Sequence, residues 1–146
     1  MKTALTPLIL DTNIVLDLFV FNDPEITALK TALLAHELNW IATSDMRIEL
    51  ERVLSYPKII PRMAFYQVTA ADVLGKFDQL ATLTNPAPRA PWICKDPDDQ
   101  PFIDLAVQHQ ATLLSKDQAV LCMAKRLLTA GAVVQKTIKF MPKIDL

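Results

Sequence analysis

Short apolar runs alternate along the chain with longer segments whose apolar residues recur at helical spacing. We predict buried strands for four of these runs, because each is almost wholly apolar and too short for a helix. They cover residues 7–10, 40–43, 111–115 and 132–134. Residues 137–140 are predicted as an additional edge strand.

The segments between these strands have the spacing of amphipathic helices. We predict helices over residues 12–20, 24–37, 45–56, 69–83 and 118–128, and one that begins near Gln100. The predicted N-terminal caps are Asp23 before Pro24, Ser44, and Asp98 or Asp99, and Gly131 is the predicted C-cap residue after the last helix. Residues 59–65 are short and broken by Pro61, and the proline-dense residues 85–101 are predicted as mainly loop.

Strands that alternate with helices predict an α/β fold, here a three-layer α/β/α sandwich with a mainly parallel central sheet. The chain has 146 residues, the size of one ordinary domain, so we expect a single domain over residues 1–146. Ligands of such sheets gather beyond the carboxyl ends of the strands. The residues that follow the predicted strands are therefore the first candidates for chemistry.

Composition narrows the classes of function. Hydrophobic residues make up 51% and charged residues 21%, which is typical of a folded domain and argues against disorder. Only two glycines occur, which excludes a glycine-rich phosphate loop. The net charge of −1 gives no support to a strongly basic nucleic-acid binder, although a local basic patch would suffice. No signal peptide or membrane span is apparent, so we expect a cytoplasmic protein without a membrane.

The two cysteines do not have the spacing of a zinc site. They are Cys94 and Cys122, and no C-x-x-C pair occurs. We interpret both as ordinary reduced thiols.

Acidic residues stand at the edges of the apolar segments in four places. Asp11 and Asp117 both follow predicted strands, and Glu49 lies beside the apolar stripe of a predicted helix. The third place, residues 96–99, holds three aspartates at a helix start. Carboxylates repel one another, so a cluster of them is costly unless a cation lies between them. Hard oxygen ligands of this kind suit Mg²⁺ or Mn²⁺.

Each acid also has a purely structural interpretation. Asp11 and Asp117 are favoured helix caps, and Glu49 could pair with Arg52 on a solvated helix face. In the third motif Asp99 is the preferred ligand, with Asp96 and Asp98 as alternatives. Asp104, further along the same predicted helix, is assigned to the surroundings of the site or to the surface.

Taken together, the motifs resemble those of the PIN-domain nucleases. The sequence L-D-T-N at residues 10–13 resembles the family's opening strand and first acid. The second-acid helix is similar to residues 49–54, the third motif to residues 96–106, and the final strand, hydroxyl residue and acid to L-S-K-D at residues 114–117. The resemblance is closest to the branch of VapC-like toxins of toxin–antitoxin pairs. Many members have a further acid after the last motif, where this chain has Gln118 and Ala119, and the choice between one and two metals stays open.

The resemblance implies a metal-dependent endoribonuclease that uses Mg²⁺ or Mn²⁺ to cleave RNA. The metal-facing acids would be Asp11, Glu49, Asp99 and Asp117, and the polar supports Asn13, Ser115 and Arg52. An antitoxin protein is the implied partner, and a homodimer is compatible with a short, apolar-rich chain.

Basic and aromatic side chains near the motifs are candidates for RNA contact. The basic candidates are Arg47, Arg52, Lys58, Arg62, Lys116, Lys125 and Arg126, with a solvated face as the alternative. Tyr56, Phe65, Tyr66 and Trp92 are candidates for base stacking, although for most of them we expect core packing instead.

Two other functions compete with this one. A catalytically silent PIN-like module would use the same fold to bind a protein. Phosphoryl transfer of the haloacid-dehalogenase type also begins with a strand and an aspartate, but needs a second aspartate where Asn13 stands.

Overall fold

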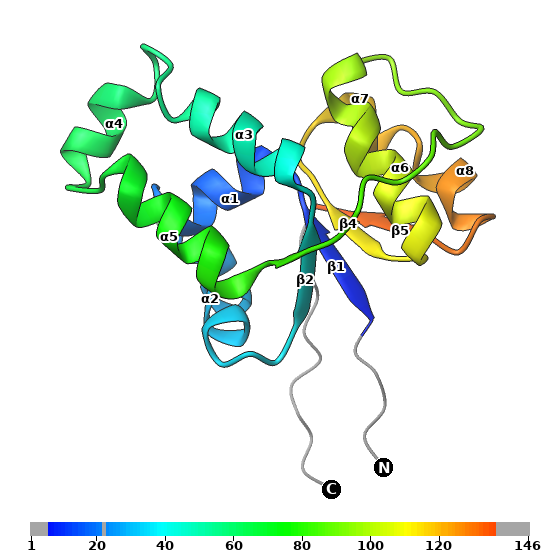
Figure 1. Cartoon of the computed structure of the whole chain (residues 1–146), viewed down its shortest axis with the longest axis horizontal. Helices are drawn as coiled ribbons and strands as arrows, with labels where there is room; N and C mark the ends of the chain where they lie inside the picture. The colour runs from blue at the N-terminus through cyan, green and yellow to red at the C-terminus, as the bar shows by residue number, and fades with distance from the viewer. Residues whose placement is uncertain (1–5, 22, 137–146) are drawn as a thin grey trace, which may run out of the picture.

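Five parallel strands form the centre of the molecule, flanked by helices on both faces (Figure 1). The computed structural model describes residues 6–21 and 23–136. The strand order is β3-β2-β1-β4-β5, with β1 (Pro7–Leu10) in the middle. The other strands are β2 (Asn39–Ala42), β3 (Thr82–Leu83), β4 (Thr112–Leu114) and β5 (Val133–Gln135). The predicted α/β class and parallel sheet are confirmed.

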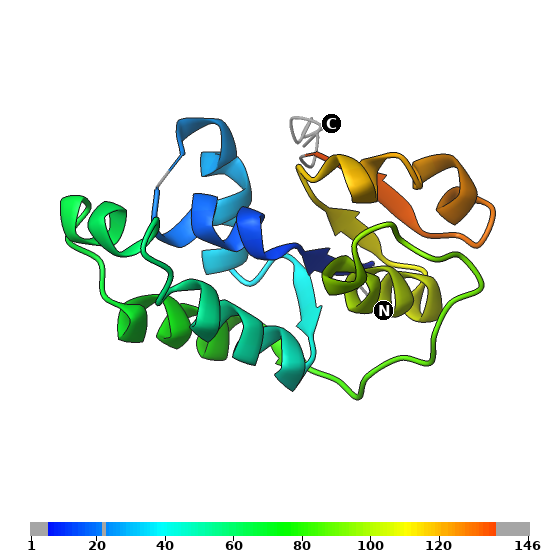
Figure 2. The same ribbon diagram turned by 90° about the horizontal axis from the view of Figure 1, so that it is seen from above.

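Helices cover the two faces in separate groups. Seen from above, α1, α2, α7 and α8 lie on one side of the strands, and α3, α5 and α6 on the other (Figure 2). Their bounds are α1 (Thr12–Phe19), α2 (Thr27–Leu34), α3 (Ser44–Val53), α4 (Ile60–Phe65), α5 (Ala70–Leu80), α6 (Gln100–His109), α7 (Gln118–Leu121) and α8 (Ala124–Leu128). None of the helices in the described ranges is long and apolar enough to cross a membrane.

The core lies between the sheet and these helices. Its strand residues include Leu8, Ile9 and Leu113, each at most 2% exposed. Trp40 of β2 is 1% exposed and packs edge-on against Phe77 of α5, with ring centroids 5.2 Å apart. Because the strands are apolar on both faces, both layers of helices are needed to bury them.

Several element boundaries differ from the sequence prediction. Residues 59–65 were expected to be broken by Pro61, but α4 forms because Pro61 lies in its first turn, where a missing N–H costs nothing. The segment after Asp23 begins with the 3₁₀ turn η1 (Pro24–Ile26) before α2. Thr43, not Ser44, caps α3, and its hydroxyl accepts from the Met46 N–H at 3.3 Å.

The predicted long helices are also shorter in the structure. Residues 118–128 form α7 and α8, separated by a turn at Cys122 and Met123. Residues 82–83, predicted as the end of the helix over residues 69–83, instead pair with β2 as β3. The predicted edge strand over residues 137–140 lies outside the described residues. Gly131 has φ of +87°, a left-handed conformation suited to glycine, but the C-cap residue of α8 is Thr129, and Gly131 lies two residues beyond it.

Candidate metal centre

Two of the predicted acids lie together because their strands are neighbours. β1 and β4 run parallel with Leu10 opposite Leu114, so both strands end at the same edge of the sheet. Asp11 follows β1 directly, and its N–H donates to the Leu114 carbonyl at 3.0 Å. Asp117 comes three residues after the end of β4. The sheet alone therefore brings the first and fourth motifs to one place.

Ser115 links these two acidic residues. Its side chain is fully buried, and its hydroxyl donates to Asp11 Oδ2 at 2.6 Å. The same Oγ accepts from the Asp117 N–H at 3.0 Å. Asp117 Oδ1 in turn accepts from the Ala119 N–H at 2.9 Å, so Asp117 caps α7 as well as facing the cluster. Asp11 stands at the cap position of α1 but makes no capping bond with its side chain.

The third motif places Asp99, rather than its neighbours, beside these acids. A 3₁₀ turn, η2 (Pro97–Asp99), precedes α6, and Asp96 caps it by accepting from the Asp98 N–H at 3.0 Å. Asp99 stands at the N-cap position of α6, one of the two positions expected, but its side chain makes no capping hydrogen bond. Asp99 is only 6% exposed, and within the described part of the chain its Oδ2 has no hydrogen-bond partner.

Asp11, Asp99 and Asp117 together form a tight acidic cluster, which we call the acid triad. Each offers an oxygen, and these oxygens lie within 4.8 Å of one another. Burial, the hydrogen bond that its protonated form makes with Asp117, and repulsion by Asp11 raise the pKa of Asp99 to about 8. Burial also raises the pKa of Asp11, although the Ser115 hydrogen bond opposes this shift. A buried cluster of this kind has a strong need for positive charge.

A divalent cation fits this arrangement. Three carboxylates supply the hard oxygen donors that Mg²⁺ and Mn²⁺ prefer. Asp99 Oδ2 is a buried polar atom that lacks a donor, and a cation would give it a partner. The triad therefore has the chemistry of a metal site.

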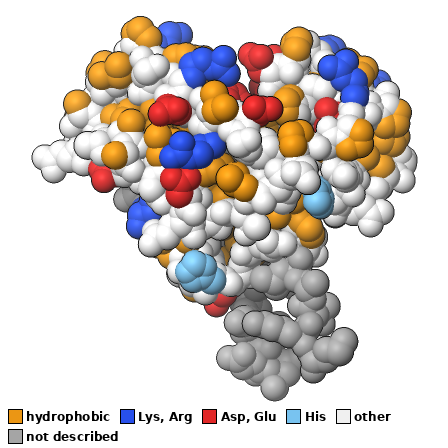
Figure 3. Space-filling view, in the orientation of Figure 1, with side chains coloured by type: hydrophobic (Ala, Val, Ile, Leu, Met, Phe, Trp, Pro, Cys, Tyr) orange, Lys and Arg blue, Asp and Glu red, His pale blue; other side chains and the backbone are white. Residues whose placement is uncertain are grey.

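Glu49 borders the triad from α3 without joining its tight group. Burial and repulsion by Asp11 raise its pKa, while Arg52 and a hydrogen bond with Thr12 lower it. Glu49 and Arg52 line a hollow of about 170 Å³ together with Asp98 of the third motif. Figure 3 shows acidic side chains gathered where the α3 side and the α6 side of the molecule meet, with basic side chains beside them. The hollow thus opens next to the acidic side chains, and one positively charged side chain, Arg52, lines it.

Other predicted side chains are engaged elsewhere. Asn13 is exposed in the first turn of α1, and no described hydrogen bond joins it to the acids. Arg47 forms two hydrogen bonds with Asp78 on α5, at 2.7 and 2.8 Å. Lys116 forms an ion pair with the buried Asp17 of α1. These contacts leave Arg52 as the candidate that the structure places at the hollow.

A buried polar network fixes the proline-rich segment that leads to Asp99. Gln100 accepts from the Cys94 N–H at 2.6 Å and donates to the Trp92 carbonyl at 3.1 Å. Asp104 Oδ1 accepts from Gln100 and from the Ala90 N–H, both at 2.8 Å. Both side chains are at most 9% exposed, so Asp104 belongs to the surroundings of the site and not to the surface.

Sequence reasoning missed Gln100 and Thr12 as supporting residues. Gln100 begins a helix whose inward face, at spacings of three and four, carries Ile103 and Asp104; a polar pair on an otherwise apolar face was the available signal. Thr12 directly follows the first acid and is 7% exposed, but its contact with Glu49 joins residues far apart in sequence.

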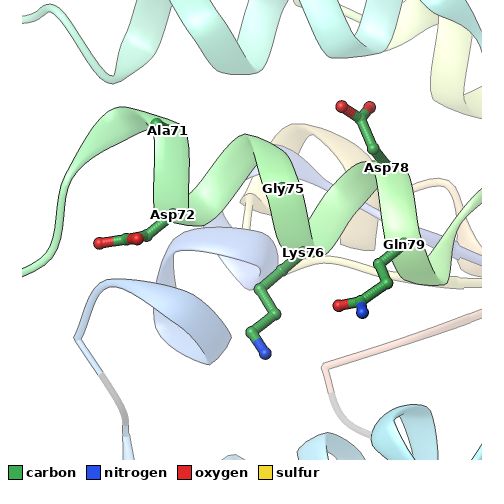
Figure 4. Close-up of a pocket in the computed structure, with 6 residues that line it drawn as sticks. All are labelled: Ala71, Asp72, Gly75, Lys76, Asp78 and Gln79. Carbon is green, nitrogen blue, oxygen red and sulfur yellow. The ribbon is translucent and has the colours of Figure 1, made fainter.

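A separate hollow of about 560 Å³ lies on the outer face of α5. Figure 4 shows that its charged side chains, among them Asp72, Lys76 and Asp78, point in different directions. Asp72 forms the capping box with Thr69, and Asp78 binds Arg47. Both acids are thus engaged in structural contacts, one with the cap of α5 and one with α3, so we do not treat this hollow as a second candidate site.

The fold and the triad define an α/β domain with an acidic site at the carboxyl edge of a parallel sheet. A family model described as the PIN domain matches residues 7–119, and the chain belongs to that family. PIN domains are generally metal-dependent nucleases, and the acid triad fits metal binding. No curated protein matches the chain significantly.

Proposed function

We propose that this protein is a metal-dependent endoribonuclease. The observation that carries the proposal is the buried Asp99 Oδ2, which lacks a hydrogen-bond partner among the described residues and lies beside Asp11 and Asp117. A group of three carboxylates, two of them buried and one of these with an unsatisfied oxygen, is costly in a domain that only needs to fold. Such a cost is explained if the cluster serves to hold a cation.

The residues of the triad would hold Mg²⁺ or Mn²⁺. When bound, such an ion lowers the pKa of water and offsets the negative charge of a phosphodiester undergoing hydrolysis. Ser115 keeps Asp11 in a fixed orientation, and the Ala119 N–H does the same for Asp117. Glu49 adds a fourth carboxylate at the rim, held by Thr12.

Arg52 is the proposed contact for the RNA backbone. It is exposed, and it lines the hollow that Glu49 and Asp98 share. A guanidinium can bind a phosphate through two parallel hydrogen bonds, which would position the strand beside the acids. Asn13, exposed at the start of α1, remains a proposed polar support.

The proposed role as the toxin of a toxin–antitoxin pair rests on the sequence resemblance. It would require a protein partner, and a homodimer is a further proposal of the same kind. Exposed apolar side chains on α4, namely Ile60 at 53% and Phe65 at 79%, offer one surface for a partner. The same surface favours the second candidate, a catalytically silent PIN-like interaction module.

The test is cleavage of single-stranded RNA with Mn²⁺, with and without a chelator, by the wild type and Asp11→Asn. Glu51→Gln is the control, because it also replaces a carboxylate with an amide, but at an exposed position outside the acid triad. We expect chelation and Asp11→Asn to abolish cleavage and Glu51→Gln to retain it. Cleavage of single-stranded DNA alone would contradict the choice of RNA.

The silent module predicts a different outcome. If the module is silent, calorimetry would show no Mn²⁺ binding, or Mn²⁺ would bind and the cleavage assay would show no product from any tested RNA. Either result would exclude the proposed nuclease activity. Turnover of a small phosphate monoester through an aspartyl phosphate would instead favour the dehalogenase-like reaction.

A further inference from the structure

The two cysteines of this chain share one hydrogen-bond acceptor. Cys94 Sγ and Cys122 Sγ each donate to the carbonyl oxygen of Ala119, and both distances are 3.4 Å. The two sulfur atoms therefore lie no further apart than twice that distance. They come from segments 28 positions apart in the sequence, so the fold and not the local chain brings them together.

The two thiols differ in their access to solvent. Cys122 is exposed at the end of α7, in the turn that separates it from α8. Cys94 is only 4% exposed and lies where the proline-rich segment meets α7. A small oxidant would therefore meet Cys122 first, and Cys94 is the neighbouring thiol that could react with the product.

We propose that hydroperoxides convert Cys94 and Cys122 into an intramolecular disulfide that weakens cation binding at the acid triad. The Cys122 thiolate attacks the peroxide oxygen, giving a sulfenic acid and releasing water or an alcohol. The Cys94 sulfur then attacks the Cys122 sulfur, and the sulfenic hydroxyl leaves as water with the Cys94 proton. The peroxide is reduced by two electrons, and the two thiols lose two hydrogen atoms.

One side of this thiol pair is hydrogen-bonded to the triad, and the other is bonded to the residue that follows Asp99. The Ala119 carbonyl accepts from the thiols, while the N–H of Ala119 binds Asp117 Oδ1 at 2.9 Å. The Cys94 N–H binds Gln100 at 2.6 Å, and Gln100 directly follows Asp99. A disulfide requires an S–S bond of about 2.05 Å and removes both S–H donors from Ala119. The bond would therefore move the supports of two of the three acids.

The experiment treats the reduced full-length protein with one equivalent of hydrogen peroxide. We expect the intact mass to fall by two hydrogen atoms, and a non-reducing peptide map to join the peptides of Cys94 and Cys122. Cys122→Ser is the control variant, because its side chain is exposed and the change conserves a donor. It should show no such cross-link. Oxygen adducts on Cys122 or dimers between chains in place of the internal bond would overturn the proposal.

The effect on the triad is measured separately from any nuclease activity. We expect Mn²⁺ affinity to fall by about tenfold on oxidation, the scale at which lost supporting contacts act on metal sites. Dithiothreitol should restore it, and Cys122→Ser should not respond to peroxide. Hydrogen exchange of the Ala119 amide should accelerate in the oxidised protein, a readout that needs no metal. If the disulfide forms and the exchange rate does not change, the coupling to the triad is wrong.

Discussion

The acid triad has two sides that are held in different ways. The strand side is Asp11 and Asp117, which follow β1 and β4, and the loop side is Asp99, which follows the proline-rich segment. Asp11 and Asp117 share the Ser115 hydroxyl, which donates to one carboxylate and accepts from the backbone of the other. Asp99 is buried beside them with an oxygen that has no partner among the described residues. One side of the triad is satisfied within the protein, and the other is not.

This difference indicates which side of the triad carries most of the unfavourable free energy of burying its carboxylates. The strand side is fixed by the pairing of β1 and β4, which the fold requires in any case. The loop side depends on Gln100 and Asp104, whose hydrogen bonds hold a proline-rich segment in place. The pKa of Asp99 rises to about 8 because burial and two neighbouring acids oppose its charge. A cation would therefore relieve the loop side most.

The largest expected effect comes from Asp99→Asn. We expect Mn²⁺ affinity to fall by more than about 100-fold, since losing a ligand should exceed the 10–100-fold cost of losing a supporting contact. Asp98→Asn is the matched control, because Asp98 is exposed and lies one residue away. Calorimetry should find its affinity within about threefold of the wild type. Equal losses in both variants would show that the third ligand is not confined to Asp99.

Supporting contacts on the two sides should have smaller and distinguishable effects. Ser115→Ala removes the donor to Asp11, so we expect a 10–100-fold loss of Mn²⁺ affinity and a loss of about 1–3 kcal/mol in the free energy of unfolding.

Asp104→Ala should lower the free energy of unfolding by a similar amount, because the Ala90 and Gln100 donors lose their acceptor. Its effect on affinity should be about tenfold or less, since Asp104 acts through Gln100.

Asp104→Asn separates the hydrogen bonds of Asp104 from its charge. An amide oxygen can still accept from both donors, so this variant should retain most of the stability that Asp104→Ala loses. Urea denaturation measures the stability and calorimetry the affinity. If Asp104→Ala lowers affinity more than Ser115→Ala, the loop side and not the strand side determines the geometry of the triad.

The pH dependence of the metal-free protein should report the same asymmetry. The folded pKa of Asp99, about 8, lies above its ordinary value of 3.8, so the folded state binds this proton more tightly than the unfolded state. The resulting stabilisation is complete below about pH 4 and is lost as the pH rises through about 8. Burial raises the pKa of Asp11 and of Glu49, which adds in the same direction.

Between pH 6 and 8 we therefore expect the free energy of unfolding to fall by about 2 kcal/mol in the presence of a chelator. Asp99→Asn cannot ionise and should flatten this slope. Urea titrations at several pH values measure it. A slope that is unchanged in Asp99→Asn would assign the proton to another member of the triad.

The sequence predicts the strand side of the site well. Parallel strands that end together bring residues after them to one edge, so Asp11 and Asp117 could be placed from the strand pattern alone. The predicted bounds of the four core strands lie within one residue of the observed bounds at each end, since apolar runs of this length have few alternatives.

The loop side could not be predicted to the same degree. The choice of Asp99 over Asp96 and Asp98 depends on the 3₁₀ turn before α6, in which Asp96 caps the turn and Asp99 is directed inward. The contacts of Gln100 with Cys94 and Trp92, and of Lys116 with Asp17, join positions that no sequence period relates. The helix break at residues 122–123 reflects tertiary packing, which local propensity does not contain. The helix α4, in contrast, obeys a local rule, because proline is tolerated in a first turn.

The smallest expected effect lies outside the triad, at the pair that joins α3 to α5. Arg47 binds Asp78 through two hydrogen bonds, but the two side chains are 32% and 52% exposed. Water and salt screen such a pair, so a double-mutant cycle of Arg47→Ala and Asp78→Ala should give a coupling of about 0.5 kcal/mol or less. The coupling should vanish at about 1 M salt. Arg47 lies two residues from Glu49 on α3. A coupling free energy above about 1.5 kcal/mol, or a loss of Mn²⁺ affinity in either single variant, would contradict this expectation. Either result would show that the buried contacts of α3 do not suffice to hold it in place. The triad would then depend on this surface pair as well as on the strands and the loop.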